Sequence, residues 1–330
     1  MPRMRSVFSS ESVKVVQFGS GGPPGSPPGR AEGWRAVTRV LRSCASTAGA
    51  LAKTIRDDSV TTFFPSDCAV CGGPMTAWSM APVCSACVER VGPQAGALCE
   101  ICGEALGMES ARFASAMGIN ACTMCRLAPP DFSRAVAYSS YEDELREMLH
   151  LLKYQRVMQL ADGQLGDWMA EAVLLLSGHV GSELTVVAVP LFAARERARG
   201  FNQSVLLADA AILRLKKLRP LLRLHADHAA LTRVRDTEAQ FGLNPHGRRR
   251  NLRGAFQVSD ASLVRGREVL LVDDVMTTGA TARECARVLI RAGAAKVWVA
   301  TLARAQAESF GSADVAVWDA VGPGPAVGFV

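Results

Sequence analysis

The stretch EVLLVDDVMTTGAT, residues 268–281, decides the fold of this chain. It begins with a continuously apolar run at 269–272, which is typical of a buried strand. Asp273 and Asp274 follow, and a turn of small residues then leads into a helical pattern of apolar residues. The order of strand, turn and helix predicts an anion-binding site, because the first N–H groups of a helix are unpaired and lie at the positive end of its dipole.

The turn consists of Thr277, Thr278, Gly279, Ala280 and Thr281. Its hydroxyls are further donors for a phosphate, and the glycine lets the backbone approach a ligand closely. Two carboxylates beside this turn would repel phosphate alone, but they can accept hydrogen bonds from ribose hydroxyls. The pattern therefore predicts a ribose 5-phosphate site, and the alternative is a strand whose aspartates only cap a turn.

The same stretch resembles the phosphoribosyl pyrophosphate (PRPP) signature of type I phosphoribosyltransferases. That signature has an apolar run, two acids, two variable residues and then T-T-G-x-T. The predicted context of a strand before it and a helix after it agrees with the resemblance.

Length, composition and charge set broad limits on the protein. Its 330 residues suggest two domains with tails, and the 49% of hydrophobic residues is ample for a core. The formal net charge of +6 is compatible with phosphate-rich partners. No apolar run approaches membrane-spanning length and no secretory signal follows Arg3 and Arg5, so we expect a cytoplasmic location.

Eight of the ten cysteines form four CxxC pairs. The pairs are Cys68/Cys71, Cys84/Cys87, Cys99/Cys102 and Cys122/Cys125. Two pairs can complete a tetrahedral four-sulfur site, for which zinc is the usual metal, so we expect about two structural zinc ions. Sequential pairing keeps the loops short and an interleaved arrangement is the alternative, while a redox role for one pair is a weaker rival.

Periodic apolar patterns predict strands and helices in alternation after the cysteines. We expect strands at 132–139, 185–190, 256–258, 269–272 and 296–302, and a short one at 221–224. Residues 191–202 read as an arginine-rich turn and 225–254 as a long mobile loop. Arg214 is expected on the solvated side of a helix. The alternation predicts a parallel sheet with helices on both faces and a ligand at the carboxyl ends of its strands.

Further motifs agree with one family. They are the four CxxC pairs, Lys153-Tyr154, VAVPL at 187–191, RERARGFNQ at 195–203, LTRVRDTEAQ at 231–240, RRRNLRGAF at 248–256 and LLVDDVMTTGAT at 270–281. Together they resemble the ComF family of competence-associated proteins over about residues 63–304.

The resemblance implies an organisation for the whole chain. It places a double zinc-ribbon module at 61–128 and a type I phosphoribosyltransferase domain at 129–304. A disordered leader with a helical segment, at 1–60, and a C-terminal tail at 305–330 lie outside it. It also implies a role in natural transformation and DNA uptake, with incoming single-stranded DNA and the competence machinery as partners.

The resemblance further implies PRPP with Mg²⁺ as the ligand, and displacement at ribose C1 with pyrophosphate leaving. Asp273 and Asp274 would hold the ribose hydroxyls and stabilise positive charge, and the residues of the turn, 277–281, would hold the 5-phosphate. Arg195 and Arg199 are candidates for pyrophosphate contacts. The flexible-loop positions that match the family are Arg233, Gln240, Arg248 and Asn251.

Two classes of function remain open at this point. One is an active phosphoribosyltransferase with an unknown acceptor. The other is a non-catalytic PRPP sensor or single-stranded DNA-binding adaptor. No acceptor-binding hood is recognisable, and little chain follows Leu302 to build one.

Overall fold

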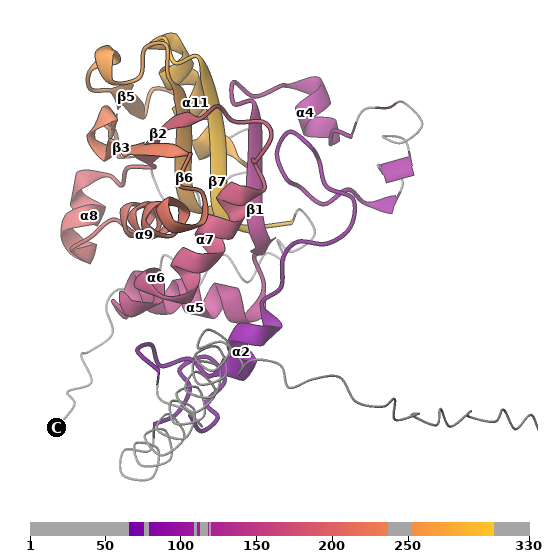
Figure 1. Ribbon diagram of the computed structural model, residues 1–330, viewed down its shortest axis with the longest axis vertical. Coiled ribbons are helices and arrows are strands. Elements are labelled where there is room, and N and C mark those ends of the chain that lie inside the picture. The colour runs from indigo at the N-terminus through magenta and orange to yellow at the C-terminus, as the bar shows by residue number, and fades with distance from the viewer. Residues whose placement is uncertain are drawn as a thin grey trace, which may run out of the picture. The chain divides into compact units, whose positions relative to one another are not determined.

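The computed structural model describes residues 66–75, 79–108, 111–112, 118, 120–236 and 252–306 (Figure 1). The expected leader, half of the expected mobile loop (residues 237–251) and the C-terminal tail beyond residue 306 lie outside the described residues.

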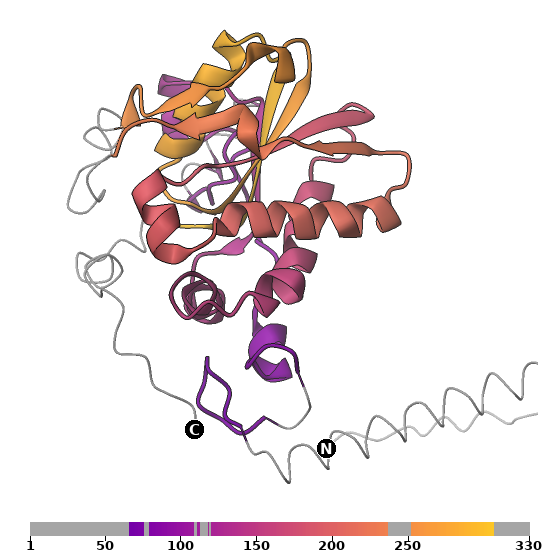
Figure 2. The same ribbon diagram turned by 90° about the vertical axis from the view of Figure 1, so that its left-hand side faces the viewer.

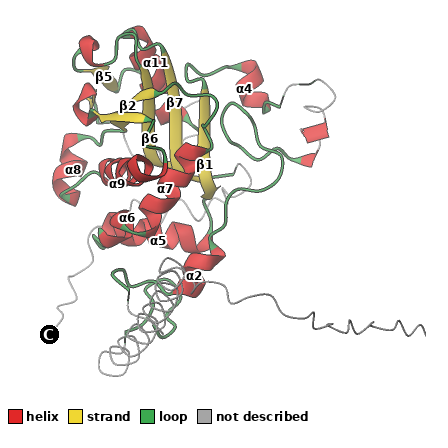
Figure 3. Cartoon of the chain, viewed as in Figure 1, coloured by secondary structure: helices red, strands yellow, loops and turns green. Residues whose placement is uncertain are grey.

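A five-stranded parallel sheet is the centre of the described chain, with the strand order β1-β7-β6-β2-β3 (Figure 3). The strands are β1 Arg134–Ser140, β2 Glu183–Ala188, β3 Arg223–Ala226, β6 Glu268–Met276 and β7 Lys296–Arg304. The apolar run of β6 is at most 1% exposed. A strand covered on both faces needs such a run, so the sequence-based prediction of a parallel sheet is confirmed.

Helices cover both faces of this sheet. They are α5 Asp143–Tyr154, α6 Gln159–Asp162, α7 Gln164–Leu174, α9 Gln203–Leu218 and α11 Ala280–Arg291. Leu270 and Val272 share a core with α5, α7 and α9, whereas Val269 and Leu271 share a core with α11. Figure 2 shows α9 as the long helix along one side of the sheet and α11 on the other.

The region predicted as a long loop contains a strand. Residues Leu231–Arg233 form β4, which pairs antiparallel with β5, Phe256–Val258. The expectation that 256–258 belongs to the parallel series is therefore wrong, as is the loop assignment for 231–233. Leu231 and Phe256 are buried. Three-residue strands carry too little periodicity to reveal a pairing across 25 residues.

The prediction of an arginine-rich turn at 191–202 is also wrong in part, because this stretch contains the helix α8, Ala193–Arg199. Alanine, glutamate and arginine favour helix, and Gly200 ends it in the left-handed conformation with φ of 86°. No residue of α8 is buried. A helix without a buried face has no apolar pattern to detect.

Arg214 does not lie on a solvated helix side as expected. It forms an ion pair with Asp167 and donates to the carbonyl oxygens of Gly163 and Ala210 at 3.0 and 3.1 Å. The side chain therefore links α9 to α7. Close packing of these two helices explains this, since a Cβ at Gly166 would lie 2.7 Å from the Ala210 Cβ.

Shorter elements complete the described chain. They are α2 Ser85–Arg90, α4 Thr123–Leu127 and the 3-10 turns His228–Ala230 and Ala261–Leu263. None of the helices in the described ranges is at once long enough and apolar enough to cross a bilayer.

Candidate functional site

The turn predicted to bind phosphate connects β6 to α11. Gly279 is the N-cap residue of α11 and has φ of 72°. A Cβ at this position would also lie 2.8 Å from Met276 Cε. The position therefore disfavours other residues chiefly through its left-handed backbone conformation, since Met276 Cε is the end of a flexible side chain that can move aside.

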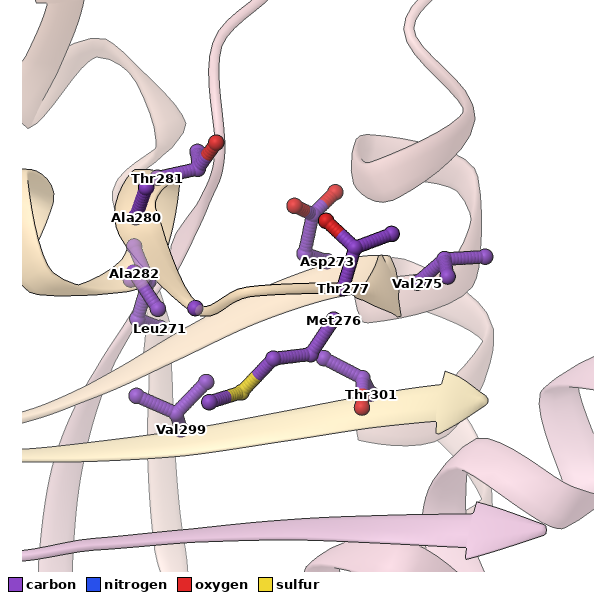
Figure 4. A pocket seen from close by; sticks show the side chains of 11 residues that line it. Leu271, Asp273, Val275, Met276, Thr277, Ala280, Thr281, Ala282, Val299 and Thr301 are labelled. Carbon is purple, nitrogen blue, oxygen red and sulfur yellow. The ribbon is translucent and has the colours of Figure 1, made fainter. Parts of the chain in front are cut away.

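Side chains around this turn line one pocket. Asp273, Thr277 and Thr281 contribute oxygen atoms to it, and Gly279 and Ala280 contribute backbone. In Figure 4 the carboxylate of Asp273 and the hydroxyl of Thr277 lie on one side of the strand, whereas Met276 extends to the other side toward Val299. The pocket thus brings a carboxylate, two hydroxyls and a helix N-terminus together.

The two aspartates have different surroundings. Asp274 is 5% exposed and its Oδ2 forms an ion pair with the ammonium of Lys153, the penultimate residue of α5. Asp273 is only partly buried, and its Oδ1 accepts from the Ser204 hydroxyl at 2.9 Å. One carboxylate therefore has a cation of the protein, and the other is held by a neutral hydroxyl at the pocket.

These surroundings separate the acidities of the pair. Burial raises the pKa of Asp273 to about 8, and the neighbouring charge of Asp274 acts in the same direction. Burial also acts to raise the pKa of Asp274, but the Lys153 ammonium outweighs it and the net shift is downward. Asp274 is therefore the more acidic carboxyl of the pair, and Asp273 is the less acidic one.

The predicted pyrophosphate residues lie on α8. The Arg199 guanidinium is 5.5 Å from the centre of the Tyr154 ring, and its Nη1 donates to Gln203 Oε1 at 2.5 Å. Burial and then the charge of Arg195 lower the pKa of Arg233. Arg195 of α8 and Arg233 of β4 therefore lie near one another, and two neighbouring cations favour an anionic ligand.

The other predicted loop residues, Gln240, Arg248 and Asn251, lie outside the described residues. Sequence reasoning missed the roles of Lys153 and Ser204. A lysine in the last turn of an amphipathic helix is expected at an exposed C-terminus, because the helix dipole favours it there. The Lys153-Tyr154 motif was the only signal at that position.

The eight paired cysteines form two groups. The first cluster is Cys68, Cys71, Cys84 and Cys87, and the second cluster is Cys99, Cys102, Cys122 and Cys125. The sulfurs within each cluster all lie within 4.8 Å of one another. The pairing is therefore sequential, and the interleaved alternative is excluded.

The geometry of both clusters fits a metal ion. Cys71 and Cys84 sulfurs are 3.8 Å apart, and Cys102 and Cys122 sulfurs are 3.7 Å apart. Tetrahedral zinc with bonds of about 2.3 Å requires about 3.8 Å between sulfurs, whereas a disulfide bond is about 2.0 Å. The N–H of Cys84 donates to Cys68 Sγ at 3.3 Å, a bond that favours a thiolate.

The turns at two of the CxxC pairs contain a glycine in the left-handed conformation. Gly72 and Gly103 directly follow the second cysteine of a CxxC pair, and their φ angles are 69° and 68°. In the second cluster the N–H of Cys122 donates to Cys99 Sγ at 3.2 Å. The left-handed glycine and the N–H to sulfur bond thus recur in both clusters.

Comparison with known proteins supports a phosphoribosyltransferase fold. Residues 202–316 match the family model described as "Phosphoribosyl transferase domain". The chain is 36% identical to "DNA utilization protein YhgH" of Salmonella typhi over 73% of this chain and 97% of that protein. It is 30% identical to "Competence protein F" of Haemophilus influenzae over 56% of this chain and 78% of that protein. It is 25% identical to "Competence protein ComFC" of Bacillus subtilis over 67% and 84% of the two chains.

Proposed function

This chain belongs to the ComF family of competence-associated proteins, and on that premise we propose that it binds PRPP together with Mg²⁺. The observation that carries the proposal is the single pocket that joins Asp273 to the turn with Thr277, Gly279 and Thr281. A carboxylate would repel phosphate in a site for phosphate alone, but the hydroxyls of a sugar phosphate can donate hydrogen bonds to a carboxylate.

Each group of residues has a part in this proposal. The hydroxyls and N–H groups of residues 277–281 bind the 5-phosphate at the N-terminus of α11. Asp273 and Asp274 accept from the ribose hydroxyls, and Lys153 keeps Asp274 ionised in the free protein. Arg195 and Arg199 on α8 neutralise pyrophosphate. Bound Mg²⁺ supplies further positive charge to the pyrophosphate oxygens.

The reaction that such a site serves is displacement at ribose C1 with pyrophosphate as the leaving group. Positive charge develops on the ribosyl ring, and the carboxylates of Asp273 and Asp274 at the end of β6 would stabilise it. The protein would contribute mainly positioning and electrostatic stabilisation. The acceptor class is a base, a nucleotide or the end of a nucleic acid.

The second candidate function is a non-catalytic adaptor that binds single-stranded DNA or senses PRPP. The exposed arginines of α8 favour it, because no residue of that helix is buried. The relative from Salmonella typhi carries the words "DNA utilization" in its name. Binding through these arginines should weaken steeply as salt rises, since each neutralised phosphate releases a counterion.

Zinc is the metal that we propose for both cysteine clusters, and their role is structural. Four thiolates fill a tetrahedral site and leave no position for a substrate. We further propose a cytoplasmic location, where the competence machinery delivers its single strand. The sulfur separations support the metal, and the family supports the location.

One experiment separates the two candidate functions. Purified protein is titrated with PRPP and Mg²⁺ in a calorimeter, and pyrophosphate release is then followed with nucleobases, nucleotides and oligonucleotides as acceptors. Binding with release supports the transferase. Binding without release for any acceptor supports the sensor, and no binding of PRPP would refute the proposed ligand.

A further inference from the structure

Arg304 is a buried arginine beneath the phosphate turn. It is the last residue of β7 and only 4% exposed. Its Nη1 donates to the carbonyl oxygen of Met276 at 3.0 Å and also to that of Thr277. These are the carbonyl groups of the last residue of β6 and the first residue of the turn.

The other side of the same guanidinium contacts the second cysteine cluster. Its Nε donates to the carbonyl oxygen of Cys102 at 3.3 Å, and its Nη2 is 3.5 Å from Glu104 Oε2. Two residues further along the chain, Gln306 Oε1 accepts from the N–H of Ala105 at 3.1 Å. Hydrogen bonds therefore hold the Cys99/Cys102 turn of the second cluster against the end of β7.

A second arginine makes a similar link from the helix that follows the turn. Arg283 lies in the first turn of α11, and its Nη1 donates to the carbonyl oxygen of Ala128 at 2.6 Å. Its Nη2 is 3.7 Å from Cys125 Sγ. The turn is thus bounded on both sides by arginines that contact the second cluster.

The first cluster has different neighbours. One link to the domain is Arg90 at the end of α2, which forms an ion pair with Glu144 on α5, and Cys68 and Cys87 also belong to the apolar core that contains α5. Arg90 also donates to Cys87 Sγ at 3.0 Å. Within the described part of the chain, these contacts connect the first cluster to the side of the sheet that α5 covers, and none of them reaches the phosphate turn.

Peptide geometry explains what Arg304 does to the turn. In a trans peptide the C=O of one residue and the N–H of the next point in opposite directions. No cis peptide occurs in the described chain. The N–H of Ala305 also donates to the carbonyl oxygen of Met276, at 3.1 Å, whereas Arg304 holds the carbonyl group of Thr277 and thereby directs the N–H group of Thr278 to the opposite side. Free N–H groups that face one way make a site for an anion.

We propose that Arg304 is a positioning residue for the phosphate turn, and that it makes phosphate affinity depend on the second cysteine cluster but not on the first. The phosphate part rests on the proposed function. Lysine cannot replace Arg304, because an ammonium lacks the planar fork that reaches Met276, Thr277 and Cys102 together.

The test compares Arg304→Lys with Arg214→Lys. Arg214 is a matched control, because it also donates to main-chain carbonyl groups but lies between α7 and α9. Both variants are expected to melt at lower temperature. At a temperature where circular dichroism shows both folded, hydrogen exchange in a peptide covering 276–286 should be faster only in Arg304→Lys. PRPP affinity should fall at least tenfold in that variant and less than twofold in the control.

A second pair of variants tests the dependence on the clusters. Cys122→Ser with Cys125→Ser, and Cys71→Ser with Cys84→Ser, should each lower the metal content by about one ion per chain. Only the first of these pairs should speed exchange in 276–286. Glu104→Ala, which keeps all cysteines, should have the same effect to a smaller extent and serves if the cysteine variants do not fold.

The outcomes distinguish the inference from the proposed function. Equal exchange in 276–286 for Arg304→Lys and Arg214→Lys would overturn the inference, as would equal effects of the two clusters. If the unmodified protein fails to bind PRPP, the proposed ligand is wrong, and the exchange measurements still decide whether Arg304 positions the turn.

Discussion

Replacing Lys153 by methionine should destabilise the protein strongly. The side chains of Lys153 and Asp274 are 17% and 7% exposed, and they form an ion pair. Methionine keeps much of the volume of lysine but leaves the carboxylate buried without a cation. Breaking a buried pair by removing one partner costs about 3–5 kcal/mol. For a domain of this size that corresponds to a fall in Tm of about 6–20 °C.

The penalty should also depend on pH in a defined direction. In the natural protein the pKa of Asp274 is lowered from 3.8, so the ion pair contributes stability above that pH and loses it as the pH falls further. Without Lys153, burial raises the pKa of the same carboxyl, and the folded state retains a proton that the unfolded chain loses. The difference in Tm between the two proteins should therefore grow as the pH rises from 4.

The assay is thermal unfolding of four proteins at pH 5 and pH 8. They are the natural protein, Lys153→Met, Asp274→Asn and the double variant, which together form a double-mutant cycle. The double variant should be more stable than either single variant, since no buried charge remains. A fall in Tm of less than about 2 °C for Lys153→Met, or additive effects of the two substitutions, would refute the reasoning.

Three further predictions concern the same site and the cysteine clusters. Because the pKa of Asp273 is raised to about 8, its protonated carboxyl stabilises the fold fully below pH 3.8, and this contribution is lost as the pH rises to about 8. Asp273→Asn should therefore flatten the decline in the free energy of unfolding across that pH range, and an unchanged slope would contradict the raised pKa. Gly279→Ala should lower stability by about 1–2 kcal/mol and PRPP affinity at least tenfold, whereas Gly266→Ala, at a φ of 71° with open space around it, should keep full affinity. Denaturant unfolding measures the stability and calorimetry the affinity, and equal affinities of the two variants would contradict the assignment of the turn as the phosphate site. Elemental analysis should find about two zinc ions per chain, and chelation should unfold residues 68–125 before the sheet. If protein purified under reducing conditions contains no zinc, the assignment of the metal is wrong.

Local patterns predicted the centre of this protein well. The apolar run of β6, the two acids and the small-residue turn all lie within fourteen residues. Their strand, turn and helix follow from burial and from the backbone freedom of Gly279, which are properties of neighbouring residues. The spacing of the CxxC pairs favoured sequential clusters, and the structure confirms that pairing.

Contacts between distant residues could not be predicted in the same way. Lys153 and Asp274 are far apart in sequence, and only the packing of α5 against the edge of the sheet brings them together. Arg304 ends a strand and precedes a tail, so its sequence position gives no sign of its contact with Cys102. In β4 and α8 the elements are too short or too exposed to carry an apolar period.

The central claim is that the carboxylate at the pocket binds a ribose while the turn binds its phosphate. Calorimetric titration of the natural protein and of Asp273→Asn with PRPP and Mg²⁺ at pH 8.5 tests it most directly, because most Asp273 is then ionised. A charge-assisted hydrogen bond contributes about 1.5–3 kcal/mol, so the natural protein should bind about 10–100 times more tightly than the variant. A plain phosphate loop predicts the opposite, since removing a negative charge beside a phosphate strengthens its binding. Equal or tighter binding by Asp273→Asn would contradict the claim.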